Sequence, residues 1–568
     1  MLTNSDESKQ KIVIIGGVAG GASAAAKARR VNEAAEIVVL EKGPYVSFAN
    51  CGLPYHISGE IQNRDELFVA TPEFLHARLN IDVRTNSEVK SIDAARGSIE
   101  VFEYTTGKTY EESYDKLIIA TGAESFRPPI PGLEAQGCFT LKTISDMDAI
   151  VSYLDRESVQ SVVVVGGGFI GLEAAEALFA LGLDVTVVEA APQILPQWDP
   201  DMADIVERHL MDKLMIEVVK NDPVSEIQQR EGKVAAVTLK SGEEIESELV
   251  LVAIGIRPNT TLAEKADIKM TEQGLIETNE HLQTSVPDIY AVGDAIQTIH
   301  RVTGTPTWLP LAGPANRQGR VAGTNAAGGE ATFPGVIGTS VVRIGKLCAA
   351  RTGLSSREAE KAGLDFFCTR TTGMSHAGYF PDAHDIDIKL VVEDKTGRLL
   401  GAQAVGRDGV DKRIDVLATS IIAGMSVGDI VDLELAYSPP YGSAKDPVNM
   451  AAMVAENTLG NITWPCSWAE VFAESPSPVI LDVRSVDERK TLYVLGSTHI
   501  PIDELRSHLG ELNPDDPIRV YCRIGQRGYY AERLLVQSGF KDVKNIAGGW
   551  RSLWGDSRDD KLVGDESD

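Results

Sequence analysis

The stretch that decides the fold is SVVVVGGGFIG at residues 161–171. A β-branched run leads directly into a glycine turn of the form G-x-G-x-x-G, and residues 172–181 continue from it as a predicted helix. A second β-branched run, 184–188, ends in the acid Glu189. This order predicts a dinucleotide-binding βαβ unit, because the glycines let the backbone approach a pyrophosphate and the acid binds ribose hydroxyls.

The same order occurs once more, near the N-terminus. A strand at 11–15 leads into GGVAGG at residues 16–21, a helix is predicted over 22–30, and a strand at 36–40 ends in Glu41. A glycine turn of some other α/β protein would explain one copy, but not two copies with acids at matching positions. The acid at Glu189 also repels a 2′-phosphate, so we expect NADH to be preferred over NADPH.

Length, charge and composition set wider limits. The chain has 568 residues, 43% of them hydrophobic and 24% charged, which is enough for three or four domains of about 100–200 residues each. The formal net charge of −28 disfavours nucleic acid and anionic lipid as partners. The sequence shows no apolar run of about 18 residues and no basic or apolar leader, so we expect a cytoplasmic protein without a membrane span. The acidic end, 556–568, is expected to be disordered.

Three further segments extend the pattern of strands ending in glycine turns: LIIATGA (117–123), LVAIG (251–255) and IYAVGDA (289–295). With the two dinucleotide turns, they resemble the two-dinucleotide flavoprotein reductases over residues 10 to about 455. The resemblance implies an α/β architecture with an FAD-binding domain (10–150 and 280–335), an NADH-binding domain (151–279) and an α+β interface domain (336–455), with Asp294 bonding the flavin ribityl chain. The residues expected to bind the two cofactors are Gly16, Gly17, Gly20, Gly21, Glu41, Ala120, Thr121, Gly122, Asp294, Ala295, Gly166, Gly168, Gly171 and Glu189.

A candidate redox cysteine lies in SFANCG at residues 47–52. It follows Glu41 by ten residues, where the chain should pass near the flavin ring. Position 56 is His56, so Cys51 lacks the second cysteine of glutathione-reductase relatives, and its partner sulfur must come from outside. A buried, inert cysteine is the alternative, but a glycine-flanked polar turn is a poor place for core packing. The six cysteines form no C-x-x-C pair and no metal-ligand spacing, so we expect free thiols and no metal.

The surroundings of Cys51 resemble the coenzyme A disulfide reductases, in which this cysteine forms a mixed disulfide with coenzyme A. Carried over to this chain, the resemblance implies a binding site on the first helix, around the thiol and at two later positions. Lysine and arginine there would supply the local positive charge that an acidic protein needs to hold a phosphorylated coenzyme. The implied coenzyme A residues are Ser23, Lys27, Arg30, Ser47, Asn50, Asn316 and Lys445.

The same resemblance implies a homodimer whose active sites are completed by both chains. Tyr379 and Tyr437 would reach across the dimer and stabilise the departing thiolate, since a phenol donates a hydrogen bond to a developing anion. For Tyr441, aromatic packing at an interface is an equal alternative. His376 is a candidate for proton transfer, although a structural hydrogen bond is the favoured interpretation.

Residues 464–555 carry a different pattern. The strands VILDVR (479–484) and IRVY (518–521) precede Cys522, which is followed by the loop RIGQR (523–527) and a predicted helix at 528–537. This resembles a single rhodanese domain, in which backbone N–H groups at a helix N-terminus stabilise a thiolate or a persulfide anion. The four residues between Cys522 and Arg527 make a loop sized for sulfur. Cys466 is a candidate relay thiol, and the remaining cysteines are expected to be packed side chains: Cys138, Cys348 and Cys368.

Together these features predict an NADH-dependent flavoprotein that reduces coenzyme A persulfide, polysulfide or coenzyme A disulfide through Cys51, with Cys522 carrying sulfane sulfur. The fusion motivates the persulfide, because a plain disulfide reductase has no need of a sulfur carrier. Two alternatives stay open. One is an NADH oxidase or peroxidase whose Cys51 cycles through sulfenic acid. The other is a sulfurtransferase whose flavoprotein half is a redox sensor.

Overall fold

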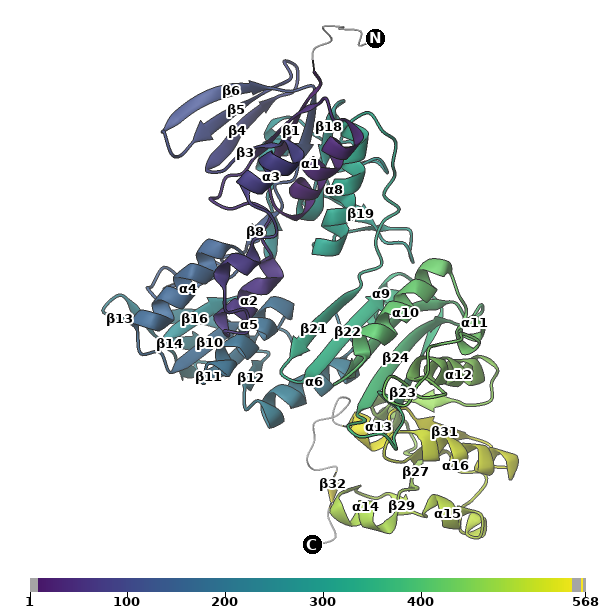
Figure 1. Cartoon of the computed structure of the whole chain (residues 1–568). Helices are drawn as coiled ribbons and strands as arrows, with labels where there is room; N and C mark the ends of the chain where they lie inside the picture. The colour runs from purple at the N-terminus through teal and green to yellow at the C-terminus, as the bar shows by residue number, and fades with distance from the viewer. Residues whose placement is uncertain (1–8, 554–562, 565–568) are drawn as a thin grey trace. The chain divides into compact units, whose positions relative to one another are not determined.

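The computed structural model describes residues 9–553 and 563–564, and within these ranges the chain forms two compact units (Figure 1). The first unit contains the described residues up to Ala190 together with Asp222–Val336. The second contains Ala191–Asn221 and the described residues from Ile337 onward. Parallel sheets flanked by helices occur in both units, which confirms the predicted α/β class.

The first sheet of the first unit holds the N-terminal glycine turn. Its strand order is β18-β7-β1-β2-β3, and every neighbouring pair is parallel. The strands other than β3 are short, rich in β-branched residues and mostly buried, as expected for a parallel sheet covered on both faces. Their bounds are β1 Lys11–Ile15, β2 Glu36–Leu40, β3 Asp82–Arg84, β7 Lys116–Ile119 and β18 Ile289–Ala291.

Two helices, α1 (Ala19–Val31) and α8 (Ala312–Ala326), pack side by side against this sheet (Figure 1). Their contact depends on small residues. A Cβ atom on Gly319 would lie 2.1 Å from the Gly20 carbonyl oxygen, and one on Gly323 would lie 2.3 Å from that of Ala24. The close approach brings side chains of the two helices together along a shared line, the α1–α8 edge.

The second glycine turn sits in a sheet of its own, where β11, β10, β16 and β9 run parallel in that order. Antiparallel ribbons accompany both dinucleotide folds (β4-β5-β6 and β13-β14-β15). The bounds are β9 Cys138–Phe139, β10 Ser161–Val165, β11 Asp184–Glu189 and β16 Leu249–Val252, with helices α4 Ile144–Arg156 and α5 Phe169–Ala180. The ribbons are β4 Ser87–Asp93, β5 Ser98–Glu103, β6 Lys108–Ser113, β13 Val224–Arg230, β14 Lys233–Leu239 and β15 Glu244–Glu246.

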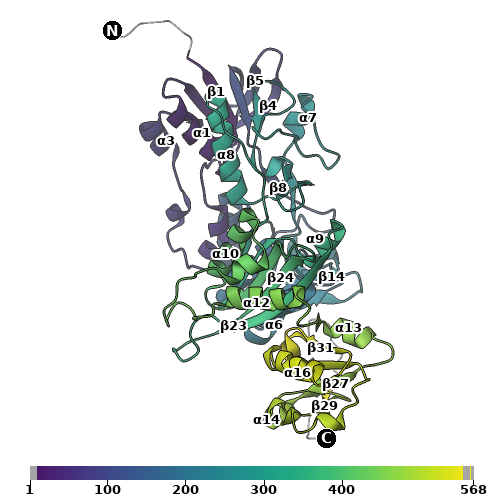
Figure 2. The ribbon, with the colours of Figure 1, turned by 90° about the vertical axis from the view of Figure 1, so that its right-hand side faces the viewer.

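The second unit is built on an antiparallel sheet of order β21-β22-β25-β24-β23. Helices α10 (Val410–Ala423) and α12 (Pro447–Leu459) pack on it, as Figure 2 shows. The strands are β21 Ser340–Ile344, β22 Leu347–Gly353, β23 Phe366–Met374, β24 Asp385–Glu393 and β25 Leu399–Gly406.

Helix α6 (Pro200–Lys213) belongs to this second unit, although its residues lie inside the segment expected for the NADH-binding domain. Buried charges hold it there. The Lys389 Nζ atom lies 3.1 Å from an Asp199 carboxylate oxygen and 2.7 Å from one of Asp201. Asp199 is fully buried and also accepts a hydrogen bond from the Gln403 side chain. Such pairing arises from tertiary packing and has no local sequence pattern.

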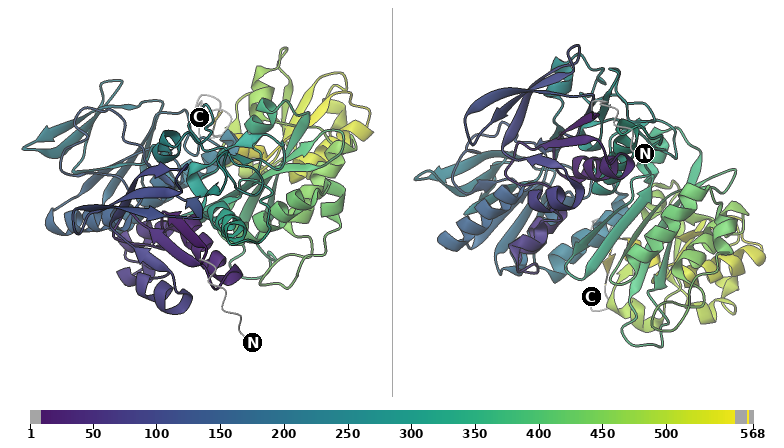
Figure 3. Two further views of the ribbon diagram at one scale, coloured as in Figure 1. Left: turned by 90° about the horizontal axis from the view of Figure 1, so that it is seen from above. Right: turned by 45° about the horizontal axis from the view of Figure 1, so that its top comes forward.

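The C-terminal part of the second unit is a parallel sheet of order β26-β31-β30-β27-β29, which lies beside the antiparallel sheet (Figures 2 and 3). Its core joins Leu481, Val520 and Leu535, all fully buried. The strands are β26 Pro465–Cys466, β27 Val479–Asp482, β29 Thr498–His499, β30 Ile518–Tyr521 and β31 Val543–Ile546, with helices α13 Trp468–Ala473, α14 Val486–Thr491, α15 Ile502–Leu505 and α16 Gln526–Gln537.

The three helices that follow glycine turns or the sulfur loop begin earlier than the sequence predicts. They start at Ala19, Phe169 and Gln526, because the last residues of each turn already adopt helical geometry. Within the expected disordered tail, residues 563–564 form a short strand, β32, paired with β28 (Tyr493–Val494), and the rest of the tail lies outside the described residues. None of the helices in the described ranges is long and apolar enough to cross a membrane.

Candidate functional site

The two glycine turns share one geometry. A Cβ atom on Gly21 would lie 1.8 Å from the Gly16 carbonyl oxygen, and one on Gly171 would lie 2.0 Å from that of Gly166. Gly16 and Gly166 have φ values of +101° and +109°, which favour glycine. Only glycine therefore fits these positions. Each turn opens onto the N-terminus of a helix, where free backbone N–H groups bind a pyrophosphate.

The acids at the ends of β2 and β11 face these turns. The Gly17 N–H donates to the Glu41 carboxylate at 2.8 Å, and the Gly167 N–H donates to the Glu189 carboxylate at the same distance. Burial raises the pKa of Glu41 above its ordinary value. Both carboxylates lie beside the position expected for a ribose, so the predicted cofactor residues fit two bound dinucleotides.

The flavin end of the first sheet is formed by the ends of neighbouring strands. Ala120 directly follows β7, and its N–H donates to the Ile15 carbonyl at 2.8 Å, while the Thr121 hydroxyl donates to the Asn259 carbonyl at 2.5 Å. Asp294 follows β18 in the 3-10 turn η3 (Gly293–Ala295). The predicted residues Ala120, Thr121, Gly122, Asp294 and Ala295 therefore meet at the carboxyl edge of the sheet, where ligands bind in such folds.

Cys51 lies in the 3-10 turn η1 (Asn50–Gly52), before α2 (Leu53–Ile57). The segment is anchored to the first glycine turn, since the Ser47 N–H donates to the Gly17 carbonyl at 2.9 Å. The Asn50 side chain donates to the Lys142 carbonyl at 3.3 Å, and the Lys142 Nζ atom lies 3.6 Å from the Asp294 carboxylate. These contacts bring the cysteine segment to the carboxyl edge of the first sheet, where the flavin is expected. Lys142 has no motif around it and was not anticipated.

A carboxylate from the second dinucleotide fold acts on the same thiol. Burial by surrounding atoms raises the pKa of Cys51, although solvent reaches the residue, and the negative charge of Glu173 raises it further. Glu173 lies on α5 and accepts a hydrogen bond from the Tyr55 hydroxyl at 3.3 Å. Because Glu173 and Cys51 are far apart in sequence, their proximity could not be predicted.

The structure brings several of the expected coenzyme A residues together on α1 and α8. The Ser23 hydroxyl donates to the Asn316 side chain at 2.5 Å. Ser23, Lys27 and Arg30 are spaced four and three residues apart, so they share one face of α1. Arg320, one turn after Asn316 on α8, is an exposed cation that was missed, although its i, i+4 spacing from Asn316 is visible in the sequence.

Lys445 belongs instead to the second unit, in which it is exposed. The same unit holds the predicted tyrosines. The Tyr379 and Tyr437 hydroxyls are 3.1 Å apart, and this hydrogen bond raises the pKa of Tyr379. Tyr379 is 77% exposed and Tyr437 is 50% exposed in the single chain. The His376 ring contacts the Ser375 hydroxyl and the Pro381 carbonyl, which supports its structural interpretation.

Cys522 lies at the end of β30, fully buried, and its Sγ atom accepts the Gly525 N–H at 3.1 Å. Arg527 also contacts this sulfur and forms two hydrogen bonds of 2.7 Å with the Glu488 carboxylate. The Arg527 guanidinium lowers the pKa of Glu488 to about 2. Glu488 was missed, although the capping pattern S-x-x-E at residues 485–488 marks it.

The other cysteines have weakly acidic thiols. Burial raises the pKa of Cys138 and Cys348 to about 11 and that of Cys368 and Cys466 to about 12. The Cys466 sulfur lies 3.8 Å from the Asn545 carbonyl oxygen. A thiol in such surroundings is a poor nucleophile, so the structure does not favour a relay role for Cys466.

The structure combines two dinucleotide folds with a lone cysteine at the expected flavin edge and a buried cysteine in a sulfur loop. This combination defines a flavoprotein disulfide reductase joined to a rhodanese domain. Comparison with known families agrees. The chain matches the pyridine nucleotide-disulphide oxidoreductase family over residues 10–319, the dimerisation domain of that family over 340–447 and the rhodanese-like domain over 467–555. The chain belongs to the pyridine nucleotide-disulphide oxidoreductases, and it therefore uses FAD and a nicotinamide dinucleotide, as predicted.

Individual relatives cover the reductase part or the whole chain. An NADH oxidase of Methanocaldococcus jannaschii is 39% identical over 79% of this chain and 100% of its own length. An NAD(P)H coenzyme A polysulfide/persulfide reductase of Pyrococcus horikoshii is 38% identical over 78% of this chain and 98% of its own length.

Among solved structures, the reduced Bacillus anthracis CoADR-RHD is 42% identical with a TM-score of 0.93, covering 97% of this chain and 99% of its own. An NAD-dependent persulfide reductase from A. fulgidus is 40% identical with a TM-score of 0.91, covering 96% and 100%. The predicted resemblance to a coenzyme A disulfide reductase–rhodanese fusion is confirmed.

Proposed function

We propose that this chain is an NADH-dependent reductase of coenzyme A persulfide, which also accepts polysulfide and coenzyme A disulfide. The observation that carries the proposal is the anchoring of the Cys51 segment. Ser47 is bonded to the first glycine turn, and Asn50 is linked through Lys142 to Asp294. A single thiol held at the flavin edge needs a partner sulfur from outside, and the relatives named above supply the class of partner.

The residues divide the work as follows. The Cys51 thiolate attacks the coenzyme A-bound sulfur of the persulfide, forming a mixed disulfide and releasing hydrosulfide. FAD, held by residues such as Glu41 and Asp294, would supply to that disulfide the two electrons that NADH brings. Cys51 then returns to the thiol and coenzyme A leaves as a thiol, with NADH and one proton consumed. Tyr379 and Tyr437 donate hydrogen bonds to the leaving thiolate.

Binding of the coenzyme falls to the α1–α8 edge. Lys27, Arg30 and Arg320 are cations on that edge, and phosphate groups pair well with such side chains. Ser23 and Asn316 contribute polar contacts between the two helices. In the second nucleotide site, the negative charge of Glu189 favours NADH by repelling a 2′-phosphate. The cytoplasmic location of the protein stays a prediction.

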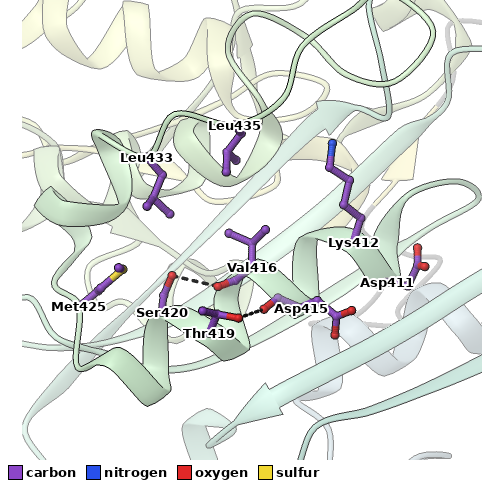
Figure 4. Close-up of a pocket in the computed structure, with 9 residues that line it drawn as sticks. All are labelled: Asp411, Lys412, Asp415, Val416, Thr419, Ser420, Met425, Leu433 and Leu435. Carbon is purple, nitrogen blue, oxygen red and sulfur yellow. Dashed lines mark hydrogen bonds between the residues drawn. The ribbon is translucent and has the colours of Figure 1, made fainter.

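A homodimer is the second part of the proposal. The second unit exposes several large apolar side chains, among them Ile422, Tyr441 and Phe380, and it contains the region matched to a dimerisation domain. A groove runs along α10. Apolar side chains gather toward one end of the groove and charged side chains toward the other (Figure 4). Its lining residues are Asp411, Lys412, Asp415, Val416, Thr419, Ser420, Met425, Leu433 and Leu435. A second copy of the chain would cover this face and bring its tyrosines to a site in the first copy.

The decisive test compares NADH oxidation with coenzyme A persulfide, polysulfide and coenzyme A disulfide. We expect the highest kcat/KM with the persulfide, and equal or better turnover of the disulfide would contradict that preference.

For the dimer, light scattering should give twice the chain mass of 61.1 kDa, and Ile422→Glu should shift the protein toward the monomer.

The similarity to an NADH oxidase makes NADH oxidation by oxygen or peroxide a second candidate function. In that case Cys51 would cycle through sulfenic acid. Rapid NADH consumption with oxygen or peroxide alone, unchanged by added thiols, would support it.

A further inference from the structure

One arginine of the rhodanese domain is held by two carboxylates of the antiparallel sheet. Arg551 lies in the 3-10 turn η5 (Gly549–Ser552). Its Nη2 atom is 3.0 Å from an Asp387 oxygen, and its Nη1 atom binds Asp385. The two acids are two residues apart on β24, so their side chains point to the same side of the strand. A guanidinium fork is suited to such a pair of acceptors.

The same 3-10 turn supports the sulfur loop. The Trp550 N–H donates to the Cys522 carbonyl at 2.7 Å, and the Arg551 N–H donates to the Arg523 carbonyl at 3.2 Å. The packing is close, because a Cβ atom on Gly549 would lie 2.3 Å from the Cys522 carbonyl oxygen. Arg523 itself lies 3.7 Å from Asp385. A single layer of residues therefore connects Cys522 to β24.

The loop that carries Tyr379 connects β23 to β24 and therefore leads directly into the N-terminal end of β24. The Ser375 N–H donates to the His384 carbonyl at 2.8 Å, so the pairing of β23 with β24 extends beyond the strands. Asp387 is buried and accepts a hydrogen bond from the Thr372 hydroxyl at 2.7 Å. These contacts fix the acids that hold Arg551. The β23–β24 hairpin, whose loop carries Tyr379, is called the Tyr379 hairpin. This hairpin and the loop of Cys522 are thus attached to the same strand, β24.

The contact is partly shielded from solvent. The Arg551 and Asp385 side chains are 29% and 27% exposed, and Arg551 has more than one acidic partner. Multiple partners and reduced exposure make such a contact stronger than an isolated surface pair. The covalent connection of the rhodanese domain is only the short segment 460–464 between α12 and β26. The ion pairs of Arg551 add a second attachment between the domain and this sheet, beside the hydrogen bond of 3.2 Å that the Arg208 side chain donates to the Arg551 carbonyl.

We propose that Arg551, Asp385 and Asp387 are positioning residues that dock the sulfur loop onto the base of the Tyr379 hairpin, so that coenzyme A collects sulfur from a fixed rhodanese domain. The inference rests on the proposed function. With thiosulfate as donor, the Cys522 thiol becomes a persulfide and sulfite leaves. The coenzyme A thiol then takes the terminal sulfur, giving coenzyme A persulfide and regenerating the Cys522 thiol. NADH and one proton convert that persulfide into coenzyme A and hydrogen sulfide.

The test is the Arg551→Gln variant in an assay where thiosulfate and catalytic amounts of coenzyme A sustain NADH oxidation by the full-length flavoprotein. Docking raises the effective concentration of the sulfur source, so we expect the KM for coenzyme A to rise about tenfold, with kcat recovered at saturating coenzyme A. The KM of Arg551→Lys should lie between those of the wild type and Arg551→Gln, because an ammonium group is charged but lacks the planar fork. Arg506→Gln, an exposed arginine of the same domain, is the matched control and should match the wild type.

Two separate assays make the result specific. Sulfur transfer from thiosulfate to cyanide and NADH oxidation with added coenzyme A persulfide should both stay at the wild-type level in Arg551→Gln. If that variant also loses the cyanide reaction, Asp385→Asn decides, because it leaves the rhodanese domain unaltered and should raise the same KM. An unchanged KM in Asp385→Asn or in an active Arg551→Gln overturns the docking proposal. A wild-type protein that oxidises NADH with added coenzyme A persulfide but not with thiosulfate and coenzyme A overturns the docking proposal and leaves the proposed function intact. A wild-type protein that fails with added coenzyme A persulfide overturns the proposed function.

Discussion

The two sulfur centres of the chain differ in every local property. Cys51 lies in an exposed 3-10 turn, where burial of the thiol and the charge of Glu173 raise its pKa. Cys522 is fully buried at a strand end, where its sulfur accepts the Gly525 N–H and contacts Arg527. The first environment disfavours a sulfur anion, whereas the second presents an N–H donor and a guanidinium group to the sulfur.

The difference matches the chemistry proposed for each site. A thiol at the flavin edge needs to become nucleophilic only when its substrate and electrons are in place, so a protonated resting state is acceptable. A carrier must hold a persulfide anion until an acceptor arrives, which requires donors and a positive charge. The comparison therefore supports the proposal that the exposed cysteine serves in reduction and the buried one in storage.

The largest expected effect separates the two centres completely. Cys51→Ser should lower NADH oxidation with coenzyme A persulfide by at least about 1000-fold, because the nucleophile is lost. Sulfur transfer from thiosulfate to cyanide should remain. Cys522→Ser should show the reverse, and Cys138→Ser should retain both activities. Loss of both activities in either single variant, with FAD still bound, would contradict the division of roles.

The next effect concerns the anion site alone. Glu488→Gln removes a charge-assisted bidentate contact to Arg527, worth about 2 kcal/mol, which corresponds to roughly 30-fold in the rate of sulfur transfer to cyanide. Asp487→Asn, on the same helix and 93% exposed, serves as control. NADH oxidation with coenzyme A persulfide should not change in either variant. A Glu488→Gln protein with the wild-type transfer rate would show that Arg527 needs no orientation.

A smaller effect is expected for the two tyrosines, which in the proposed function donate hydrogen bonds to the leaving thiolate. Tyr379→Phe and Tyr437→Phe should each lower kcat of persulfide reduction roughly tenfold. Because the hydroxyls are 3.1 Å apart, the double variant should lose less than the product of the single effects. Tyr441→Phe is the control. Strictly multiplicative losses would indicate independent roles.

The smallest effect concerns the pKa of Cys51. Glu173→Gln removes a negative charge, so the pKa of the thiol should fall and the thiolate fraction at pH 8 should rise. Alkylation of Cys51 by iodoacetamide, followed by mass spectrometry, should accelerate about threefold at pH 8, since a screened charge shifts a pKa by about half a unit. The acceleration should disappear at a pH above both pKa values. A slower reaction in the variant would reverse the sign assigned to Glu173.

Much of the architecture follows from local sequence. The glycine turns could be predicted because each needs a conformation or a close approach that only glycine permits, and the acids Glu41 and Glu189 follow at fixed distances. Tyr379 and Tyr437 came from the family resemblance, and the structure places their hydroxyls in contact. Glu488 could have been found from its capping pattern.

Other partners depended on packing between distant segments. Lys142, in the segment between β9 and α4, reaches Asp294 although β9 and β18 belong to different sheets, and Glu173 acts on Cys51 because α2 packs against α5. The placement of α6 with the second unit depends on a buried lysine from β24 and a glutamine side chain from β25. These partners come from segments that no periodicity or motif relates.

The sequence by itself determined two dinucleotide folds, a lone cysteine after the first and a sulfur loop in a rhodanese domain, because turns and short motifs impose local backbone conformations. The tertiary structure alone decided the electrostatic surroundings of each cysteine and the attachment of Arg551 to Asp385 and Asp387. Charges act through space, so their effect on a thiol or a docked domain depends on which segments the fold brings within a few ångströms.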